Sequence, residues 1–281
     1  ADLVELIFVA AALSSALLHA GWNAAVKGTS NPTQAMTAQA IVAALLSLPG
    51  FLLTGLPDPA SWPWIAASTG VYVVTISALL RGYEHGGFGI VYSVSRAIGV
   101  LLVVPLAALF VGDRIGRAAL AGVAIIALSL GALAWDAKRD QTASFRALGW
   151  TLLAGLGIAT YVLCDTRGVR AAGSPAAYGF AVSIGNAIVM WIRQRHLGSP
   201  WAQIRDQWRI AVPAGVASTA SYLLILWVWN HAPIAPAAAL RDTSAVFAIL
   251  IAIVWLKEPF TRTRIAAVLL AAAAVPLLRL G

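Results

Sequence analysis

The chain has 281 residues, of which 60% are hydrophobic and only 11% charged, with a mean hydropathy of +0.83. A soluble globular domain has about a quarter of its residues charged, so this composition excludes a water-covered surface of ordinary polarity and predicts an all-α integral membrane protein. The net charge of +8 comes from basic residues spread over short gaps between apolar runs. That distribution is typical of membrane-protein loops and argues against nucleic acid as a partner.

Ten apolar runs follow one another along the chain, each close to the ~20 residues that a membrane-spanning helix needs. They cover residues 3–26, 34–55, 62–81, 88–111, 117–135, 147–168, 175–192, 208–230, 235–256 and 262–280. Backbone groups cannot stay unpaired in lipid, so the runs are predicted to be helices. The first run is too long for a signal peptide and lacks a basic start, so we expect it to be the first spanning helix.

The second half of the chain repeats the first at an offset of 145 residues. At this offset three pairs of residues with the same charge align: Arg96 with Arg241, Asp113 with Glu258, and Arg117 with Arg262. One residue of slip also places His85 on His231. With five helices in each half, the second half must cross the membrane in the opposite sense. We therefore predict two inverted five-helix repeats, 1–138 and 146–281, with a substrate site near the midplane between them.

Four segments resemble a known family, and the resemblance that they carry extends over essentially the whole chain. They are Leu18-His-Ala-Gly-Trp-Asn-Ala-Ala-Val-Lys-Gly28, Val111-Gly-Asp-Arg, Tyr161-Val-Leu-Cys-Asp-Thr-Arg-Gly-Val-Arg170 with Gly173-Ser-Pro175, and Ala239-Leu-Arg-Asp-Thr through Leu256-Lys-Glu-Pro. This pattern is similar to EamA domains of the drug/metabolite transporter superfamily. The resemblance implies ten helices in two EamA repeats, with a cavity lined mainly by the first, third and fourth helices of each half.

The resemblance leaves the substrate open. Relatives export amino acids, nucleosides or drugs, and YddG-type exporters of aromatic amino acids are among them, so the fold does not fix the substrate. The first repeat also departs from the family pattern, because Asp113 stands in place of its glutamate and Arg114 in place of its proline.

One polar stripe in the first run is the leading candidate for the cavity wall. His19, Trp22 and Asn23 have i, i+3 and i+4 spacing and share a helix face, with Ser15 one turn earlier. A polar residue inside a membrane helix costs free energy, so we interpret such a residue as a candidate functional residue. This face suits an amphipathic substrate with an aromatic part and a carboxylate or amine. The alternative is that these side chains hold packed helices together.

Two arginines and one aspartate form a second candidate set. Arg96 and Arg241 lie about 13 Å into their runs, too deep for easy snorkelling. Each needs a partner or a watery cavity, where an arginine can bind a carboxylate bidentately. Asp165 is a candidate partner for either arginine, or a protonatable coupling group. The alternative is a buried structural ion pair.

The remaining candidates have weaker support. We expect the cavity to be lined also by Tyr83, Tyr92, Tyr161, Tyr222 and Ser244. His85 and His231 are expected to act at gates because Gly- or Pro-marked breaks follow them, and the alternative for both is an ordinary interfacial loop. Charged residues at the ends of the runs are interpreted as loop anchors and helix caps: Lys27, Arg81, Asp113, Arg117, Glu258 and Arg262.

Loop charge and family resemblance disagree on orientation. Ten spans put both termini on one side. The loops on that side carry five basic residues, and the loops on the opposite side carry twelve. The positive-inside rule then places both termini outside, whereas the resemblance implies that both lie inside. We leave the orientation open and expect a multi-pass protein of the bacterial inner membrane.

The sequence predicts a secondary transporter of small metabolites, expected to export amino acids including aromatic ones by alternating access. The alternatives are a multidrug or nucleoside exporter of the same fold, and a membrane scaffold without transport. An enzyme is not expected, because the four histidines are scattered and no metal-binding or nucleophile–base motif appears. No cofactor and no ATP site are expected. The partners are a small-molecule substrate and the lipid bilayer, and a monomer suffices because one chain holds both repeats.

Overall fold

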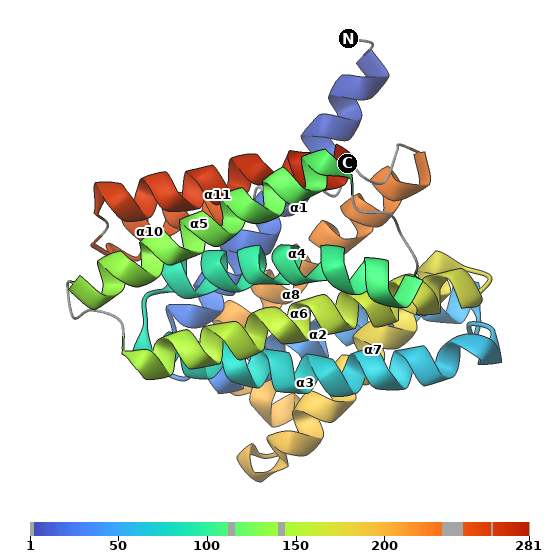
Figure 1. Cartoon of the computed structure of the whole chain (residues 1–281). Helices are drawn as coiled ribbons and strands as arrows, with labels where there is room; N and C mark the ends of the chain where they lie inside the picture. Colours follow the sequence, from blue (N-terminus) through green and yellow to red (C-terminus); the bar gives the residue numbers. More distant parts are fainter. Residues whose placement is uncertain (1–2, 112–115, 140–143, 232–243, 260, 281) are drawn as a thin grey trace.

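The computed structural model of the chain describes residues 3–111, 116–139, 144–231, 244–259 and 261–280. Over these ranges the chain forms α-helices joined by short connections, with two 3-10 turns, Pro59–Ser61 and Arg195–Leu197, and no strand (Figure 1). The helices are α1 (Leu3–Lys27), α2 (Pro32–Thr54), α3 (Trp62–His85), α4 (Phe88–Val111), α5 (Arg117–Arg139), α6 (Phe145–Ala171), α7 (Pro175–Arg193), α8 (Pro200–His231), α10 (Ser244–Val254) and α11 (Arg262–Leu280).

Several helices begin at a polar residue that caps the free backbone N–H groups of the first turn. The side chain of Asn31 accepts the Gln34 N–H at 3.1 Å before α2, and Ser144 accepts the Ala147 N–H at 3.1 Å before α6. Ser174 caps α7 in the same way. Such caps satisfy N–H groups that have no partner within the helix.

Each of the ten predicted runs overlaps a helix in the described part of the chain, but two boundaries differ. Helix α8 begins at Pro200 rather than at residue 208, because Ser199 caps it and Pro200 is compatible with its first turn. The polar residues Arg205 and Asp206 hide this start from a search for apolar residues alone. The run 235–256 is described only from Ser244, because residues 232–243 lie outside the described ranges.

In the described chain, five helical stretches are long and apolar enough to cross a membrane. They are Leu6–Lys27, Pro32–Thr54, Pro59–His85, Phe145–Ala171 and Pro175–Arg193. Shorter apolar stretches occur in α4, α5, α10 and α11. The protein is therefore a multi-pass membrane protein, and the prediction that all ten runs span the bilayer stays a prediction. Large apolar side chains cover the outside, and Leu53 and Phe145 are 89% and 86% exposed.

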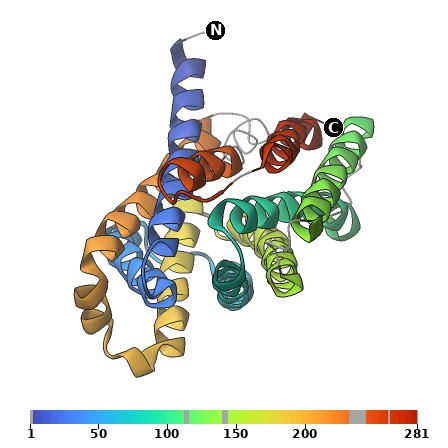
Figure 2. The same ribbon diagram turned by 90° about the vertical axis from the view of Figure 1, so that its left-hand side faces the viewer.

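The helices pack in pairs that correspond between the two parts of the chain (Figures 1 and 2). Helix α3 packs along α6, and α1 along α8. Similarly, α4 packs on α6 and α1 on α10, while α2 packs on α8 and α3 on α7. The pairs α2–α7, α4–α10 and α5–α11 each join helices that occupy the same position in the order of the two parts. If α1 is exchanged with α6, α2 with α7, α3 with α8, α4 with α10 and α5 with α11, each of these last three pairs becomes itself. Each of the other six pairs becomes another observed pair.

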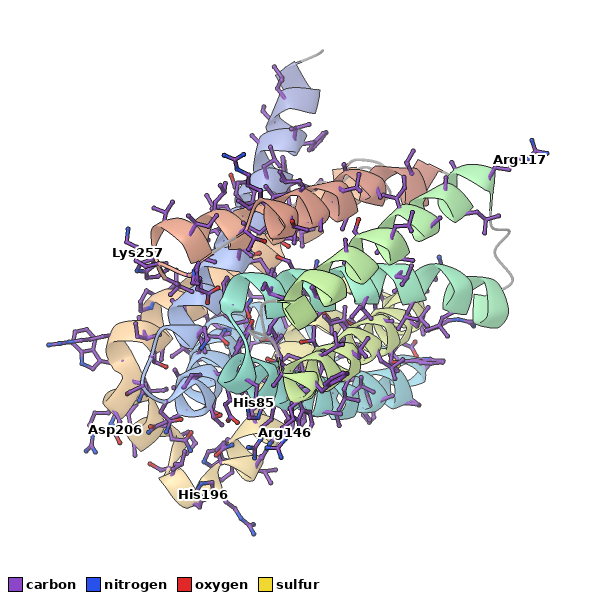
Figure 3. The ribbon with its side chains drawn as sticks, turned by 60° about the vertical axis from the view of Figure 1, so that its left-hand side comes forward. His85, Arg117, Arg146, His196, Asp206 and Lys257 are labelled. Atoms are coloured by element: carbon purple, nitrogen blue, oxygen red, sulfur yellow. The ribbon has the colours of Figure 1, made fainter. Side chains whose placement is uncertain are left out.

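The connections α1–α2, α3–α4 and α10–α11 meet at one end of the molecule, which we call the Glu258 end. A Cβ atom on Gly28 would lie 3.5 Å from Leu256, and one on Gly87 would lie 2.7 Å from the carboxylate of Glu258. In Figure 3, Arg117 at the start of α5 lies far from Lys257 and His85. The two termini of α4 therefore lie at opposite ends of the molecule.

Small residues let α4 and α6 pack closely. A Cβ atom on Gly99 would lie 2.6 Å from Ile158, and one on Gly155 would lie 2.6 Å from Cβ of Ile98. Each isoleucine therefore fills the space above the glycine of the other helix. Close backbone approach of this kind is typical of helix pairs in membranes, where van der Waals packing replaces the hydrophobic effect.

Candidate functional site

Five ring-bearing side chains form an aromatic cluster where α1 and α3 meet the first turns of α4. The ring of His19 lies 5.4 Å from that of Trp22, edge-on, and 6.3 Å from that of Tyr92. Phe88 joins the cluster through Tyr92 at 5.2 Å and Tyr83 at 5.7 Å. These centroid distances fall in the range of favourable aromatic pairs. The structure thus brings together His19, Trp22, Tyr83 and Tyr92, which the sequence analysis named, and adds Phe88.

Three buried polar atoms, two in this cluster and one at the start of α10, have no hydrogen-bond partner among the described residues. They are Nε1 of Trp22, the hydroxyl of Tyr83 and Oγ of Ser244. Trp22 is 9% exposed and Ser244 is fully buried. A buried polar group without a partner costs about 1–3 kcal/mol, so its presence needs a reason. A polar group without a partner can form a hydrogen bond to a ligand, and no hydrogen bond within the protein has to break first.

Asn23 has a local role in this structure. Its side-chain amide donates to the carbonyl oxygen of His19 at 2.9 Å, one turn earlier in α1. The residue is 3% exposed, and its predicted contact with a substrate stays a prediction. Ser244 lies beside the crossing of α4 and α10, where the hydroxyl of Ser93 donates to the carbonyl oxygen of Ala245 at 3.1 Å.

Ser15 and Ser221 join α1 to α8 by a reciprocal pair of hydrogen bonds. The hydroxyl of each serine donates to the carbonyl oxygen of the other at 2.7 Å, and the two hydroxyl oxygens lie 3.1 Å apart. Both residues are buried. Ser15 lies on the same helix face as His19, but its hydroxyl holds two packed helices together. This is the alternative that the sequence analysis left open for that face.

We expect the two serines to stabilise the fold as a coupled pair. Ser15→Ala and Ser221→Ala should each lower the free energy of unfolding by about 1 kcal/mol, with a coupling of ~0.6–1.7 kcal/mol in a double-mutant cycle. Thermal or chemical denaturation in detergent measures these values. Thr160→Ala is the matched control, because its hydroxyl bonds only to its own helix at Leu156. Fully additive serine effects would contradict the paired role.

Asp165 binds a residue that the sequence analysis missed. The hydroxyl of Tyr178 in α7 donates to the carboxylate of Asp165 at 3.0 Å, and Tyr178 is 2% exposed. Only the short connection 172–174 separates α6 from α7, and this closeness in sequence could have suggested the pair. Tyr222 lies next to this pair, since a Cβ atom on Gly179 would collide with its hydroxyl. The predicted pairing of Asp165 with an arginine stays a prediction.

The other predicted site residues are distributed over several helices. Arg96 is half-buried in α4, four residues after Tyr92. Tyr161 in α6 is close enough to Tyr72 for their hydroxyls to interact electrostatically. Arg241 lies outside the described residues.

The two histidines predicted at gates occupy the last positions of their helices. His85 ends α3 and is half-buried, and the backbone of His231 ends α8. Gly86, which follows His85, is extended with φ −153° and ψ 162°. The chain therefore does break after His85, and the gating role of both histidines stays a prediction.

Glu258 caps a helix that lies 170 residues away in the sequence. Its Oε1 accepts the N–H of Phe88 at 2.6 Å, and its Oε2 accepts the N–H of Gly89 at 3.0 Å. Both N–H groups belong to the first turn of α4, where the helix dipole favours a negative charge. The sequence interpreted Glu258 as an anchor or cap at a helix end, and the structure assigns it to the first turn of α4.

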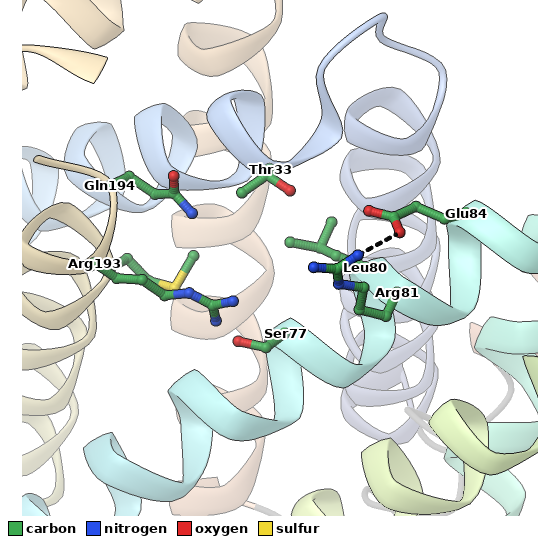
Figure 4. A pocket seen from close by; sticks show the side chains of 8 residues that line it. Thr33, Ser77, Leu80, Arg81, Glu84, Arg193 and Gln194 are labelled. Carbon is green, nitrogen blue, oxygen red and sulfur yellow. Dashed lines mark hydrogen bonds and ion pairs between the residues drawn. The ribbon is translucent and has the colours of Figure 1, made fainter. Parts of the chain in front are cut away.

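A hollow of about 130 Å³ lies between α2, α3 and α7 (Figure 4). Its lining residues are Thr33, Ser77, Leu80, Arg81, Glu84, Met190, Arg193 and Gln194. Arg81 and Glu84 form an ion pair at 3.1 Å, and both side chains are about half exposed, so the pair contributes little to stability. None of the predicted substrate-binding residues lines this hollow. Over the described residues no group of three potential metal ligands occurs.

The comparison with known families concerns the part of the chain that contains Asp165, Tyr178, Ser244 and Glu258. Residues 145–280 match the model of the EamA-like transporter family. No curated protein matches the sequence. The match begins with α6 and ends with α11. Residues 145–280 are therefore similar to the EamA-like transporter family, whose domain is typical of membrane transporters of the drug/metabolite transporter superfamily.

Proposed function

We propose that the protein is a secondary transporter of small metabolites, built from two inverted five-helix repeats, 1–138 and 146–281. Its substrate site lies near the midplane, and access alternates between the two sides of the membrane. In this proposal all ten apolar runs cross the bilayer, and a monomer in the bacterial inner membrane is the working unit. The protein is not an enzyme.

The correspondence of helix pairs supports the two-repeat architecture. An inverted repeat requires that a contact between two helices of one part have an equivalent after the parts are exchanged. The pairs α3–α6 and α1–α8 meet this requirement, as do α4–α6 and α1–α10. The pairs that join equivalent helices, α2–α7, α4–α10 and α5–α11, are those that a twofold axis passes through.

The observation that carries the proposed substrate class is a pair of buried donors without a described partner, one in the aromatic cluster and one at the crossing of α4 and α10. Trp22 and Tyr92 offer apolar ring faces, while the indole N–H of Trp22 and the hydroxyl of Ser244 have no described partner. Amino acids, aromatic ones included, present both a hydrophobic side chain and a carboxylate. We therefore propose amino-acid export of the YddG type, with Trp22, Tyr92 and Ser244 in contact with the substrate. His19, Asn23, Arg96, Tyr161, Asp165, Tyr222 and Arg241 complete the proposed lining.

Counterflow in proteoliposomes tests this function. Purified protein is reconstituted with an unlabelled substrate inside, and the entry of labelled aromatic, branched and small amino acids, a nucleoside and a cationic drug is measured. We expect saturable exchange of amino acids that exceeds the exchange in empty liposomes. Exchange of only the nucleoside or the drug would favour the alternative substrate classes. No exchange of any compound by folded protein would favour the scaffold.

A further inference from the structure

The contact between Glu258 and α4 joins the EamA-like domain to the first part of the chain. The carboxylate lies in the α10–α11 connection, whereas the two N–H groups that it accepts begin α4. Hydrogen bonds to a charged acceptor are about twice as strong as those between neutral groups, and the helix dipole adds to them. The two bonds fix the first turn of α4 against the end of α10.

The backbone on both sides is shaped to receive this carboxylate. Lys257 has φ 55°, a left-handed conformation that residues other than glycine rarely adopt. The chain after α10 also folds back, with the N–H of Glu258 bonded to the carbonyl oxygen of Ala252 at 2.9 Å. On the other side Gly87 leaves room for the carboxylate, since a Cβ atom there would lie 2.7 Å from Oε2. Glu258 is thus directed at α4 by its own connection.

The capped turn closes over the aromatic cluster. Phe88, whose N–H binds Oε1, is fully buried and contacts the rings of both Tyr83 and Tyr92. Trp22 and Ala24 of α1 and Ala252 of α10 belong to the same buried core. At this end, buried residues of α1, α3, α4 and α10 are therefore packed into one core. Moving the first turn of α4 away would separate Phe88 from the cluster.

We propose that Glu258 is the latch of one gate of the transporter: its bonds to α4 keep the Glu258 end closed, and their release opens it. This inference rests on the proposed transport function. Release is feasible because Glu258 is only partly buried, so water can replace the two N–H groups as partners of the carboxylate. Gly86 and Gly87 lie between α3 and α4 and allow the first turn of α4 to swing. If the protein were a membrane scaffold without transport, its function would not require the Glu258 end to open.

Cysteine labelling in nanodiscs, where both membrane faces are accessible, tests the latch. The only cysteine of the chain is Cys164, so a Cys164→Ser protein with Ala24→Cys carries one reporter. Ala24 is fully buried in the core that the latch closes. We expect Glu258→Gln to raise the rate of maleimide labelling at position 24 about tenfold, because an amide is uncharged and has a single acceptor oxygen, so one bond to α4 is lost and the other is weakened. Glu84→Gln is the matched control, an exposed glutamate at the end of α3, and should change nothing.

A second variant disturbs the same contact from the α3–α4 connection and leaves the charge of Glu258 unchanged. In Gly87→Ala the new methyl group would displace the flexible carboxylate of Glu258 rather than a backbone atom. We expect the same rise in labelling as in Glu258→Gln. Unchanged labelling in both folded variants would overturn the latch. Labelling reports opening whether or not a substrate is moved. Faster labelling without counterflow would therefore support the latch and count against transport of the tested compounds. Counterflow with unchanged labelling would support transport and count against the latch.

Discussion

Gly155→Leu should prevent α4 from packing on α6 and leave little folded protein. A Cβ atom at this position would lie 2.6 Å from Cβ of Ile98 and 3.1 Å from the backbone oxygen of Ser95. The side chain of Ile98 is enclosed, and the oxygen of Ser95 belongs to the backbone of α4, so neither can move aside cheaply. Overpacking of this kind costs about 1–3 kcal/mol or more, and leucine adds three further carbon atoms.

The measurement is the yield of monodisperse protein in detergent and its thermal unfolding midpoint. Gly149→Leu is the matched control, because Gly149 lies in the same helix and a Cβ atom there would meet nothing within 4 Å. Leucine favours helix over glycine, so the control should be as stable as the parent protein or more so. Equal behaviour of the two variants would show that the close contact of α4 with α6 is not required for folding.

Ser244→Ala should weaken substrate binding about 10- to 100-fold while leaving the stability of the protein nearly unchanged. The hydroxyl is fully buried and has no partner among the described residues, so its removal breaks no described hydrogen bond. If it binds the substrate, the variant loses one buried hydrogen bond to a charged group, which is about 1.5–3 kcal/mol. The concentration of half-maximal counterflow and the thermal unfolding midpoint measure the two effects separately.

Ser93→Ala provides the reverse case at the same helix crossing. Its hydroxyl donates to the carbonyl oxygen of Ala245 at 3.1 Å and therefore stabilises the α4–α10 contact. We expect a loss of about 1 kcal/mol in unfolding free energy with substrate affinity retained. If Ser244→Ala keeps full affinity, the buried hydroxyl is not a substrate ligand.

Trp22→Phe should also lower the efficiency of counterflow about tenfold, because it removes the indole N–H and keeps an aromatic ring beside His19. The smaller ring costs stability through the space that it leaves, so the unfolding midpoint is measured in parallel. Trp201→Phe is the control, since Trp201 is 73% exposed at the start of α8. Equal counterflow in both variants would remove Trp22 from the proposed site.

The sequence alone determined the class of the protein and the positions of its helices. Lipid requires every backbone group to be paired and long stretches to be apolar, so composition and run length identify helices with few alternatives. The same requirement predicted α1 through α7 nearly to their ends. It failed at the start of α8, where Arg205 and Asp206 interrupt the apolar pattern although Ser199 and Pro200 mark a helix start.

Part of the candidate site could also be predicted, because helical spacing fixes which residues share a face. His19 and Trp22 were placed together in this way, and their rings do touch. Spacing cannot tell what faces them from another helix. Tyr92, Tyr83 and Phe88 joined them only in the folded chain. The hydrogen bonds of Ser15 with Ser221 and of Asp165 with Tyr178 likewise join different helices and could not be read from helical spacing.

Glu258 illustrates the division between the two kinds of information. Its place at a helix end follows from the sequence, since a charge between two apolar runs must lie near the membrane surface. That it accepts N–H groups of α4, rather than of the neighbouring α11, was decided by the tertiary structure. The physical reason is that a cap binds whichever unsatisfied N–H groups lie within reach of its oxygens, and in a helix bundle those groups come from a distant part of the chain.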